Sequence, residues 1–178
     1  MKLLEYLKSD LGRITKPTFF NFLKAYFFPL RTVGVYRYIF WLRVLQFSKK
    51  NLFFKYLIGI PSYFIFQHYT YKFGIHINTN IPIGKGLCIV HGGTVYINCK
   101  SIGENVTIHQ CVTLGSKHGS DNIPILEDGV TIYTGAVVCG DIILHNRCTI
   151  GANSYVDCDV EADCTVAGSP AKVISYKK

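Results

Sequence analysis

From Ile77 onward, apolar or small residues recur every six positions in this chain of 178 residues. A helix needs an apolar period of 3.6 residues and a flat strand a period of two, so neither is the repeating element. Six is the period of a parallel β-helix of hexapeptide repeats, in which each coil buries the apolar side chains of the coil before it. We therefore predict a mainly β fold, a β-helix with about 18 residues in each triangular coil.

Two series of residues carry this period. The first is Ile102, Ile108, Leu114, Leu126, Ile132, Val138, Leu144, Ile150, Val156 and Ala162. The second lies four residues further on, at Val106, Val112, Val130, Ala136, Ile142, Cys148, Ser154, Val160 and Val166. The rhythm starts earlier, at Ile77, Ile83, Ile89 and Val95, and shifts by one residue before Ile102. Because Leu114 and Leu126 are twelve apart, residues 115–125 can form a loop without breaking the register.

Charge and aromatic residues divide the chain into unlike parts. The net charge is +8. The residues before Ile77 contribute twelve Lys or Arg against Glu5 and Asp10, together with all twelve Phe. We expect a helical, basic and aromatic region over 1–72, a β-helix domain over 73–168 and a C-terminal tail over 169–178.

Apolar spacing predicts helices in the N-terminal region. A first helix would bury Leu3, Leu4, Leu7, Leu11 and Ile14, and a second Val35, Phe40, Leu42 and Leu45, with Pro17, Pro29 and Pro61 dividing the region into pieces. The longest uncharged stretch, Tyr56 to Tyr71, is shorter than the roughly 20 residues that cross a bilayer. Two interpretations of the region remain open. Its aromatic residues pack inside an oligomer, or its basic face rests on anionic lipid.

Several function classes are disfavoured. The seven cysteines include no CxxC pair, which argues against a zinc site or a disulfide framework. No nucleic-acid-binding motif accompanies the basic charge. Lys2, Glu5, Lys8 and Asp10 interrupt any signal-peptide core, so we expect a cytoplasmic protein, with peripheral contact at the inner face of the membrane as an option.

Two segments, GKGLCIVHGGTVYINCKSIGENVTIHQCVTLG at 84–115 and AGSPAKVI at 167–174, resemble the serine acetyltransferase-like branch of the hexapeptide acyltransferases. Within that branch the chain looks closest to acetyltransferases of exopolysaccharide and colanic-acid pathways. The resemblance implies a homotrimer of left-handed β-helices. It also implies acetyl-CoA as co-substrate, bound in a groove between neighbouring prisms, and acetyl transfer to a hydroxyl without a metal.

Three histidines are candidate catalytic residues. His91 matches the family's general base, and an unperturbed imidazole, with a pKa of about 6.5, suits that task. Gly92 and Gly93 beside it would let substrate approach the backbone and would offer amide donors. His109 lies eighteen residues after His91 and should share its face on the next coil, one position out of phase. His118 lies on the predicted loop, where it could close over substrate.

Three further residues match the family's cofactor positions. Ala136 and Ala152 correspond to places where backbone groups meet the pantetheine arm, and ordinary packing of the repeats is the alternative explanation for both. Lys172 matches a basic residue near the phosphates of coenzyme A, for which a lysine supplies a point charge.

Departures from the serine-specific pattern bear on the acceptor. Val90 and His76 stand where that pattern has acids, and Ile123 where it has a second histidine. His76 could hydrogen-bond His91 but brings no carboxylate. We therefore expect O-acetylation of a sugar hydroxyl in surface polysaccharide synthesis, with L-serine O-acetylation and an inactive scaffold as alternatives. A zinc carbonic anhydrase on the same fold is disfavoured, because Leu114 stands five residues after His109.

Overall fold

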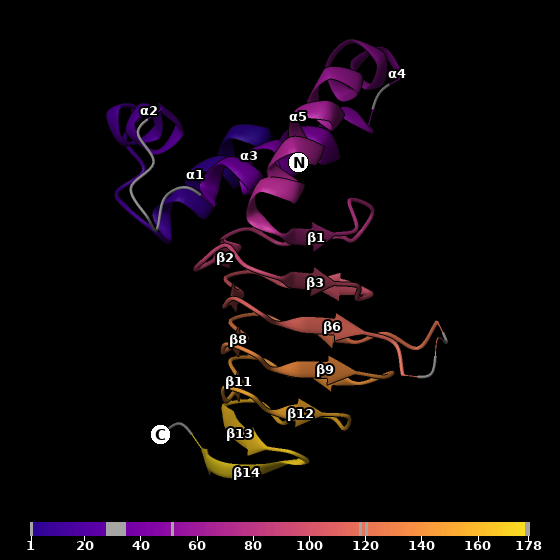
Figure 1. The fold of residues 1–178 in the computed structure, drawn as a ribbon. Coiled ribbons are helices and arrows are strands. Elements are labelled where there is room, and N and C mark those ends of the chain that lie inside the picture. The colour runs from indigo at the N-terminus through magenta and orange to yellow at the C-terminus, as the bar shows by residue number, and fades with distance from the viewer. Residues whose placement is uncertain (1, 28–34, 51, 118, 120, 177–178) are drawn as a thin grey trace.

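The computed structural model describes residues 2–27, 35–50, 52–117, 119 and 121–176. A group of helices covers one end of a stack of β-coils, and the C-terminal strands close the other end (Figure 1). The N-terminal helices predicted from apolar spacing and the β-coils predicted from the six-residue period are both present.

The helical region contains α1 (Leu3–Gly12), α2 (Phe19–Phe27) and α3 (Tyr36–Ser48). A continuous helical segment follows, made of α4 (Leu52–Phe54), the π-helical turn η1 (Lys55–Gly59) and α5 (Ile60–Phe73). Among the described residues no helix is both long enough and apolar enough to span a bilayer.

Two expectations about these helices were wrong in detail. Pro61 does not divide the region, because it lies in the first turn of α5, where a helix tolerates a residue without an N–H. Leu4 is 62% exposed, whereas Leu7 and Leu11 of the same helix are buried, so the buried face of α1 is narrower than predicted. Pro17 does separate α1 from α2, and Pro29 lies outside the described residues.

The β-strands form three stacks of parallel strands, one on each side of the coil. The first contains β1 (Ile75–Ile77), β3 (Val95–Ile97), β6 (Thr113–Gly115), β9 (Val137–Cys139) and β12 (Tyr155–Val156). The second contains β4 (Ser101–Ile102), β7 (Ile125–Leu126) and β10 (Ile143–Leu144). The third contains β2 (Cys88–Ile89), β5 (Thr107–Ile108), β8 (Thr131–Ile132), β11 (Thr149–Ile150) and β13 (Cys164–Gly168), with β14 (Ala171–Tyr176) antiparallel at its edge.

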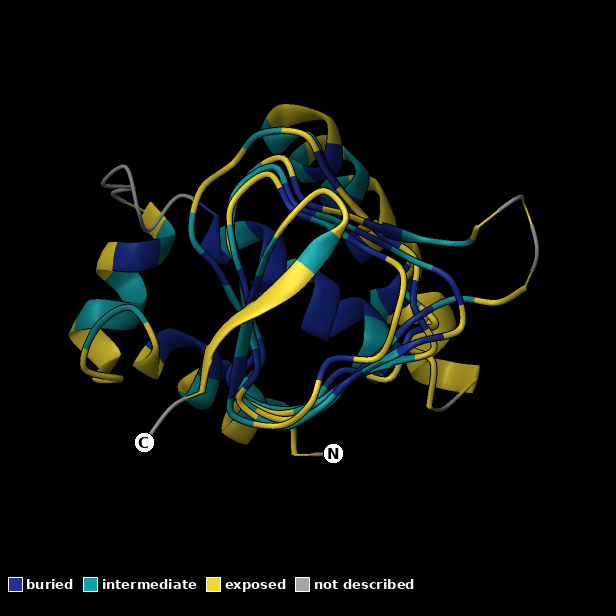
Figure 2. Cartoon of the chain, turned by 90° about the horizontal axis from the view of Figure 1, so that it is seen from below, coloured by how far each residue is buried: buried dark blue, intermediate teal, exposed yellow. Residues whose placement is uncertain are grey.

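The strand register confirms the hexapeptide repeat. Thr131 of β8 pairs with Thr149 of β11, eighteen residues later. Thr107 of β5 pairs with Thr131, twenty-four residues later. This coil is six residues longer than the next because it contains the segment between β6 and β7. Viewed along the stack, successive coils superpose around a buried interior, and this segment projects from the prism (Figure 2).

Both apolar series line the interior, with one exception. Every member from Ile102 to Val156 and from Val106 to Val166 is buried, but Ala162 is exposed. The last coil has two residues fewer, so Ile150 pairs with Val166, sixteen residues later. Val160 therefore takes the place beside Leu144 that the strict period assigned to Ala162.

A buried ion pair joins the helices to the first coil. Arg43 of α3 donates from Nε and Nη2 to the two carboxylate oxygens of Asp10 of α1, at 2.8 and 3.1 Å. The guanidinium also donates to the carbonyls of Ile83 and Gly84, at 2.9 and 2.6 Å, and Asp10 accepts the amide of Leu87 at 2.9 Å. Burial raises the pKa of Asp10 above its usual value, while the Arg43 guanidinium opposes that rise.

Replacing Asp10 with Asn should destabilise the protein strongly. The substitution leaves the buried Arg43 charge without its counterion, which costs about 3–5 kcal/mol of unfolding free energy. Urea denaturation followed by circular dichroism measures the loss. Glu5→Gln is the matched control, because the Glu5–Lys85 pair is exposed to water and contributes little. Equal losses in the two variants would contradict the anchoring role of Asp10.

Candidate active site

His91 lies in the turn that follows β2, and the end of α5 holds this turn in place. The amide of Gly93 donates to the carbonyl of Phe73, the last residue of α5, at 2.8 Å. A Cβ on Gly92 would lie 3.4 Å from Phe73, and Gly93 has a φ of +133°, so glycines suit this tight approach. His91 itself is exposed. The turn therefore presents an imidazole to solvent on a fixed backbone.

Gly74 determines how α5 leads into the prism. It ends α5 in the left-handed conformation, with φ 62°, which is the usual role of a C-terminal glycine. Its carbonyl then accepts the amide of Val95 at 2.8 Å. The His91 turn and the strand that follows it, β3, are thus both bonded to the end of α5.

The coil register places His109 beside Val90 and places Gln110 beside His91. Ile89 pairs with Ile108, a separation of nineteen residues. The one-position phase difference predicted between His91 and His109 is thus present. The His109 ring packs on Tyr133, with centroids 4.8 Å apart.

His91 influences His109 electrostatically. Burial lowers the pKa of His109 below its ordinary value, and the charge of His91 lowers it further. A cation on one ring disfavours a cation on the other at short range. Both effects favour the neutral form of the His109 imidazole.

Gln110 is a candidate that the sequence analysis missed. Its backbone carbonyl accepts the Thr134 hydroxyl at 3.0 Å, which fixes the residue on the prism. Its side-chain oxygen is buried and has no hydrogen-bond partner among the described residues. The sequence signal for this pairing is the one-residue shift in the repeat before Ile102. The shift makes the coil nineteen residues long instead of eighteen, which aligns Gln110 with His91.

The predicted loop is anchored at its base. Lys117 donates to Asp157 at 2.9 Å, and the Pro124 carbonyl accepts the Lys100 amide at 2.8 Å. Ile123 is half-buried beside Pro124. His118, predicted as a site residue on this loop, lies outside the described residues, so its role stays a prediction.

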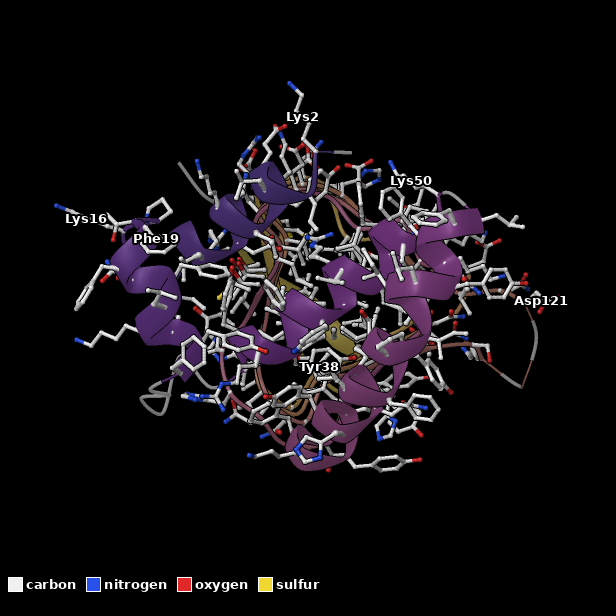
Figure 3. The ribbon with its side chains drawn as sticks, turned by 90° about the horizontal axis from the view of Figure 1, so that it is seen from above. Lys2, Lys16, Phe19, Tyr38, Lys50 and Asp121 are labelled. Carbon is white, nitrogen blue, oxygen red and sulfur yellow. The ribbon has the colours of Figure 1, made fainter. Side chains whose placement is uncertain are left out.

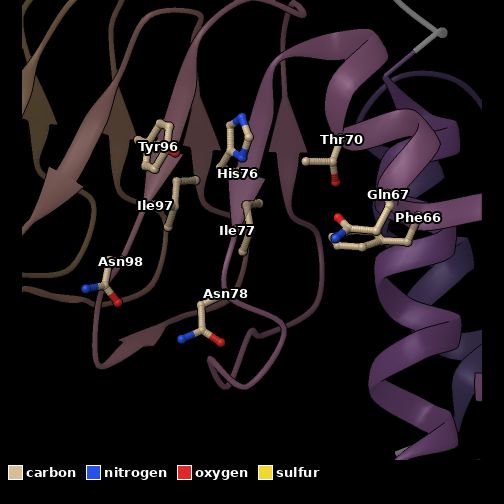
Figure 4. A pocket seen from close by; sticks show the side chains of 9 residues that line it. All are labelled: Phe66, Gln67, Thr70, His76, Ile77, Asn78, Tyr96, Ile97 and Asn98. Atoms are coloured by element: carbon tan, nitrogen blue, oxygen red, sulfur yellow. The ribbon is translucent and has the colours of Figure 1, made fainter. Parts of the chain in front are cut away.

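A groove of about 450 Å³ lies between α5 and the first stack of strands (Figure 4). On its strand side, the ring of His76 stacks on Tyr96, with centroids 4.6 Å apart. Asn78 and Asn98 follow at matching register positions, and Gln67 and Thr70 face them from α5. The sequence signal is a pair of similar tripeptides, His-Ile-Asn at 76–78 and Tyr-Ile-Asn at 96–98, which the six-residue analysis did not use.

The three predicted cofactor residues differ in their surroundings. Ala136 is fully buried in the prism core, its amide donates to Tyr133 and its carbonyl accepts from Thr113, so packing accounts for this alanine. Ala152 is exposed on a turn, and Lys172 is exposed on β14. The role of each residue toward the cofactor stays a prediction.

Strand β13 lies between the turn that carries Ala152 and the strand that carries Lys172. The Gly151 amide donates to the Val166 carbonyl at 2.8 Å, and Ala167 pairs with Lys172. Three strand spacings separate β2 from β11, so His91 and Ala152 lie roughly 14 Å apart along the prism. An exposed small residue and a lysine at that distance from an imidazole fit a long cofactor that carries phosphates at one end. No group of His, Cys, Asp and Glu in the described parts of the chain is arranged to hold a metal ion.

Comparisons with known proteins agree with this arrangement. No family model matches the chain. The serine acetyltransferase of Staphylococcus aureus strain Mu50 is 42% identical over 104 residues, which are 57% of this chain and 49% of that protein. The chain thus spans about half the length of the curated relatives it matches, such as the Synechococcus elongatus serine acetyltransferase, of which it covers 43%.

Solved structures extend the likeness to the helices. The serine acetyltransferase of Brucella abortus strain S19 in complex with coenzyme A has a TM-score of 0.76 at 25% identity, over 97% of this chain and 68% of that one. The Neisseria gonorrhoeae serine acetyltransferase in complex with serine has a TM-score of 0.69 at 26% identity, over 96% and 68%.

In sequence and in fold the chain is similar to the hexapeptide-repeat acyltransferases. Within that class the relatives are serine acetyltransferases, and this chain is a homologue of them. The expectation of a left-handed β-helix is confirmed by the same likeness. The narrower resemblance to exopolysaccharide acetyltransferases is not borne out.

Removing the His91 ring should raise the pKa of His109. The charge of His91 is one of the two causes that lower it, so His91→Ala leaves burial as the remaining cause. Titration of the histidine ring protons by NMR measures the shift. His145→Ala is the control, because His145 lies against Glu127. A His109 pKa that stays the same in His91→Ala would contradict the proximity of the two rings.

Proposed function

We propose that this chain is an acetyl-CoA-dependent O-acetyltransferase. The observation that carries the proposal is the His91 turn, an exposed imidazole on a backbone fixed by Phe73 and Gly93, in a fold shared with serine acetyltransferases. We propose the activity, the acetyl donor and the acceptor together, because the chain spans only part of the length of its curated relatives. The alternative function, an inactive scaffold, gives no reason for the exposed imidazole of the His91 turn.

His91 is the general base in this account. It takes the proton of the acceptor hydroxyl while that oxygen attacks the thioester carbonyl, and the acetyl group passes from sulfur to oxygen. The thiol of coenzyme A then leaves with a proton. The Gly93 amide is already bonded to Phe73 and does not serve as an oxyanion donor, contrary to the sequence expectation. Gln110, beside His91 in the register, offers an amide side chain for positioning the base or the acceptor.

Ala152 and Lys172 bind the donor in this proposal. Lys172 pairs with a phosphate of coenzyme A, and the small Ala152 lets the pantetheine arm lie against the prism. The cofactor groove lies between neighbouring prisms, so the proposal includes a trimer. His109 and the loop residue His118 are the further catalytic candidates, and Ala136 contributes through packing.

L-serine is the acceptor that the relatives support best, because their printed names identify them as serine acetyltransferases. The sugar acceptor that the sequence analysis put first is the second candidate. One observation favours it: Val90 and Ile123 offer neither a carboxylate nor an imidazole, while the nearby groove offers a stacked His76–Tyr96 pair and several amides.

His91→Ala should lower kcat by about 10²- to 10⁴-fold, because it removes the base and leaves the binding surface intact. Release of free thiol from acetyl-CoA in the presence of acceptor measures the rate, and the affinity for coenzyme A should stay nearly the same. His145→Ala serves as the control. A His91→Ala enzyme that keeps half of the wild-type rate would exclude His91 as the base.

Val90→Asp should improve L-serine as an acceptor if L-serine binds here. A carboxylate beside the candidate base can pair with the amino group of serine, and a charged hydrogen bond of this kind is worth about tenfold or more in kcat/KM. The ratio of kcat/KM for L-serine to that for a nucleotide sugar is compared between wild type and variant, with Val90→Asn as the uncharged control. If the wild type acetylates the nucleotide sugar and Val90→Asp leaves the kcat/KM ratio unchanged, the result favours the sugar as acceptor.

A further inference from the structure

The helical segment Leu52–Phe73 exposes a row of large apolar side chains, which we call the outer stripe: Phe53, Tyr56, Leu57, Ile60 and Phe64. Their exposed fractions are 66, 62, 59, 50 and 68%. The opposite face of the segment is buried at Gly59, Ser62, Phe66 and Thr70. A Cβ on Gly59 would lie 2.9 Å from the Ser48 hydroxyl, so this face already packs closely on α3. The outer stripe therefore points away from the rest of the subunit.

The charges in the chain segment that carries the outer stripe all have one sign. The sequence contains no Asp or Glu between Asp10 and Glu104. Lys55 lies within the helical segment, Lys50 just precedes it and Lys72 lies near its end, and all three are exposed. Lys50 points outward in the view onto the helical end of the molecule (Figure 3). The helical segment that carries the stripe thus has exposed lysines and no acidic residue of its own.

This charge pattern selects among the partners that could cover the stripe. A second copy that packed the same face against it would bring lysines against lysines. An anionic lipid surface instead attracts each nearby lysine and accepts exposed aromatic and aliphatic side chains at the level of its headgroups. We propose that the outer stripe docks this protein on the surface of an anionic lipid membrane, with Lys50 and Lys55 against the headgroups.

The docked orientation follows from the position of the helices. They cover the end of the prism opposite to the β13–β14 hairpin (Figure 1), so contact through the stripe leaves the coils extending away from the lipid. Phe64 and Phe73 are nine residues apart on α5, or about 14 Å along the helix. Because Phe73 holds the His91 turn, docking keeps the candidate active site near the membrane surface and still open to water.

Vesicle co-sedimentation of the full-length protein tests the proposal. Wild type should bind phosphatidylglycerol-containing vesicles at low salt, bind pure phosphatidylcholine vesicles weakly, and lose its binding at high salt. Replacing Phe53, Leu57 and Phe64 together with Ser should weaken binding to anionic vesicles by about tenfold or more. Lys50→Glu with Lys55→Glu should weaken it to a similar extent while retaining the apolar side chains.

The control is a variant at the other end of the molecule. Val173 and Ile174 of β14 are 50 and 64% exposed, and their replacement with Ser removes exposed apolar surface from the end opposite the helices. That variant should bind vesicles as wild type does. Circular dichroism and sedimentation velocity of every variant establish that it is folded and report its oligomeric state.

Three results would overturn the proposal. The first is a wild-type protein that does not bind anionic vesicles at low salt. The second is a stripe variant that binds these vesicles as wild type does. The third is a stripe variant that forms a smaller oligomer, because copies of this chain would then cover the stripe. The readout is independent of acetyl transfer, so an inactive protein that binds vesicles would contradict the proposed function and leave the docking surface supported.

Discussion

Stacking of each coil on the one before it determines where the functional side chains lie. The interior series from Ile102 to Val156 is buried along its whole length, and parallel backbone hydrogen bonds fix each coil against the next. Residues far apart in sequence therefore become neighbours at a spacing set by the coil length. Gln110 lies beside His91 because that coil has nineteen residues, and Ala152 approaches Lys172 because the last coil has sixteen.

The helices act on the site through two contacts with the first coil. The Asp10–Arg43 pair bonds to backbone groups at Ile83, Gly84 and Leu87, just before β2. Phe73 then bonds to Gly93 on the other side of His91. The turn that carries the candidate base is thus fixed from both directions by elements outside the β-helix. A prism without its helices would keep the repeat and lose this fixation.

The sequence predicted the features that depend on a long repeating signal. The six-residue period identified the β-helix, every residue of its two apolar series except Ala162 is buried, and the spacing of Leu114 and Leu126 allowed for the loop. The two-residue shortening of the last coil escaped it, because a strict period cannot anticipate the change that exposes Ala162. Pro61 was misjudged because proline is tolerated in a first helical turn. The groove at His76 and Tyr96 depends on contacts between strands twenty residues apart, which a six-residue period does not reveal.

The central claim is that this protein moves an acetyl group from acetyl-CoA to a hydroxyl. The most direct test is mass spectrometry of a reaction that contains purified protein, acetyl-CoA and a panel of L-serine and nucleotide sugars. The account predicts an acetyl ester on one acceptor and free coenzyme A in equal amount, both absent when the protein is heat-denatured. Intact acetyl-CoA with every acceptor, from protein shown to be folded, would contradict it.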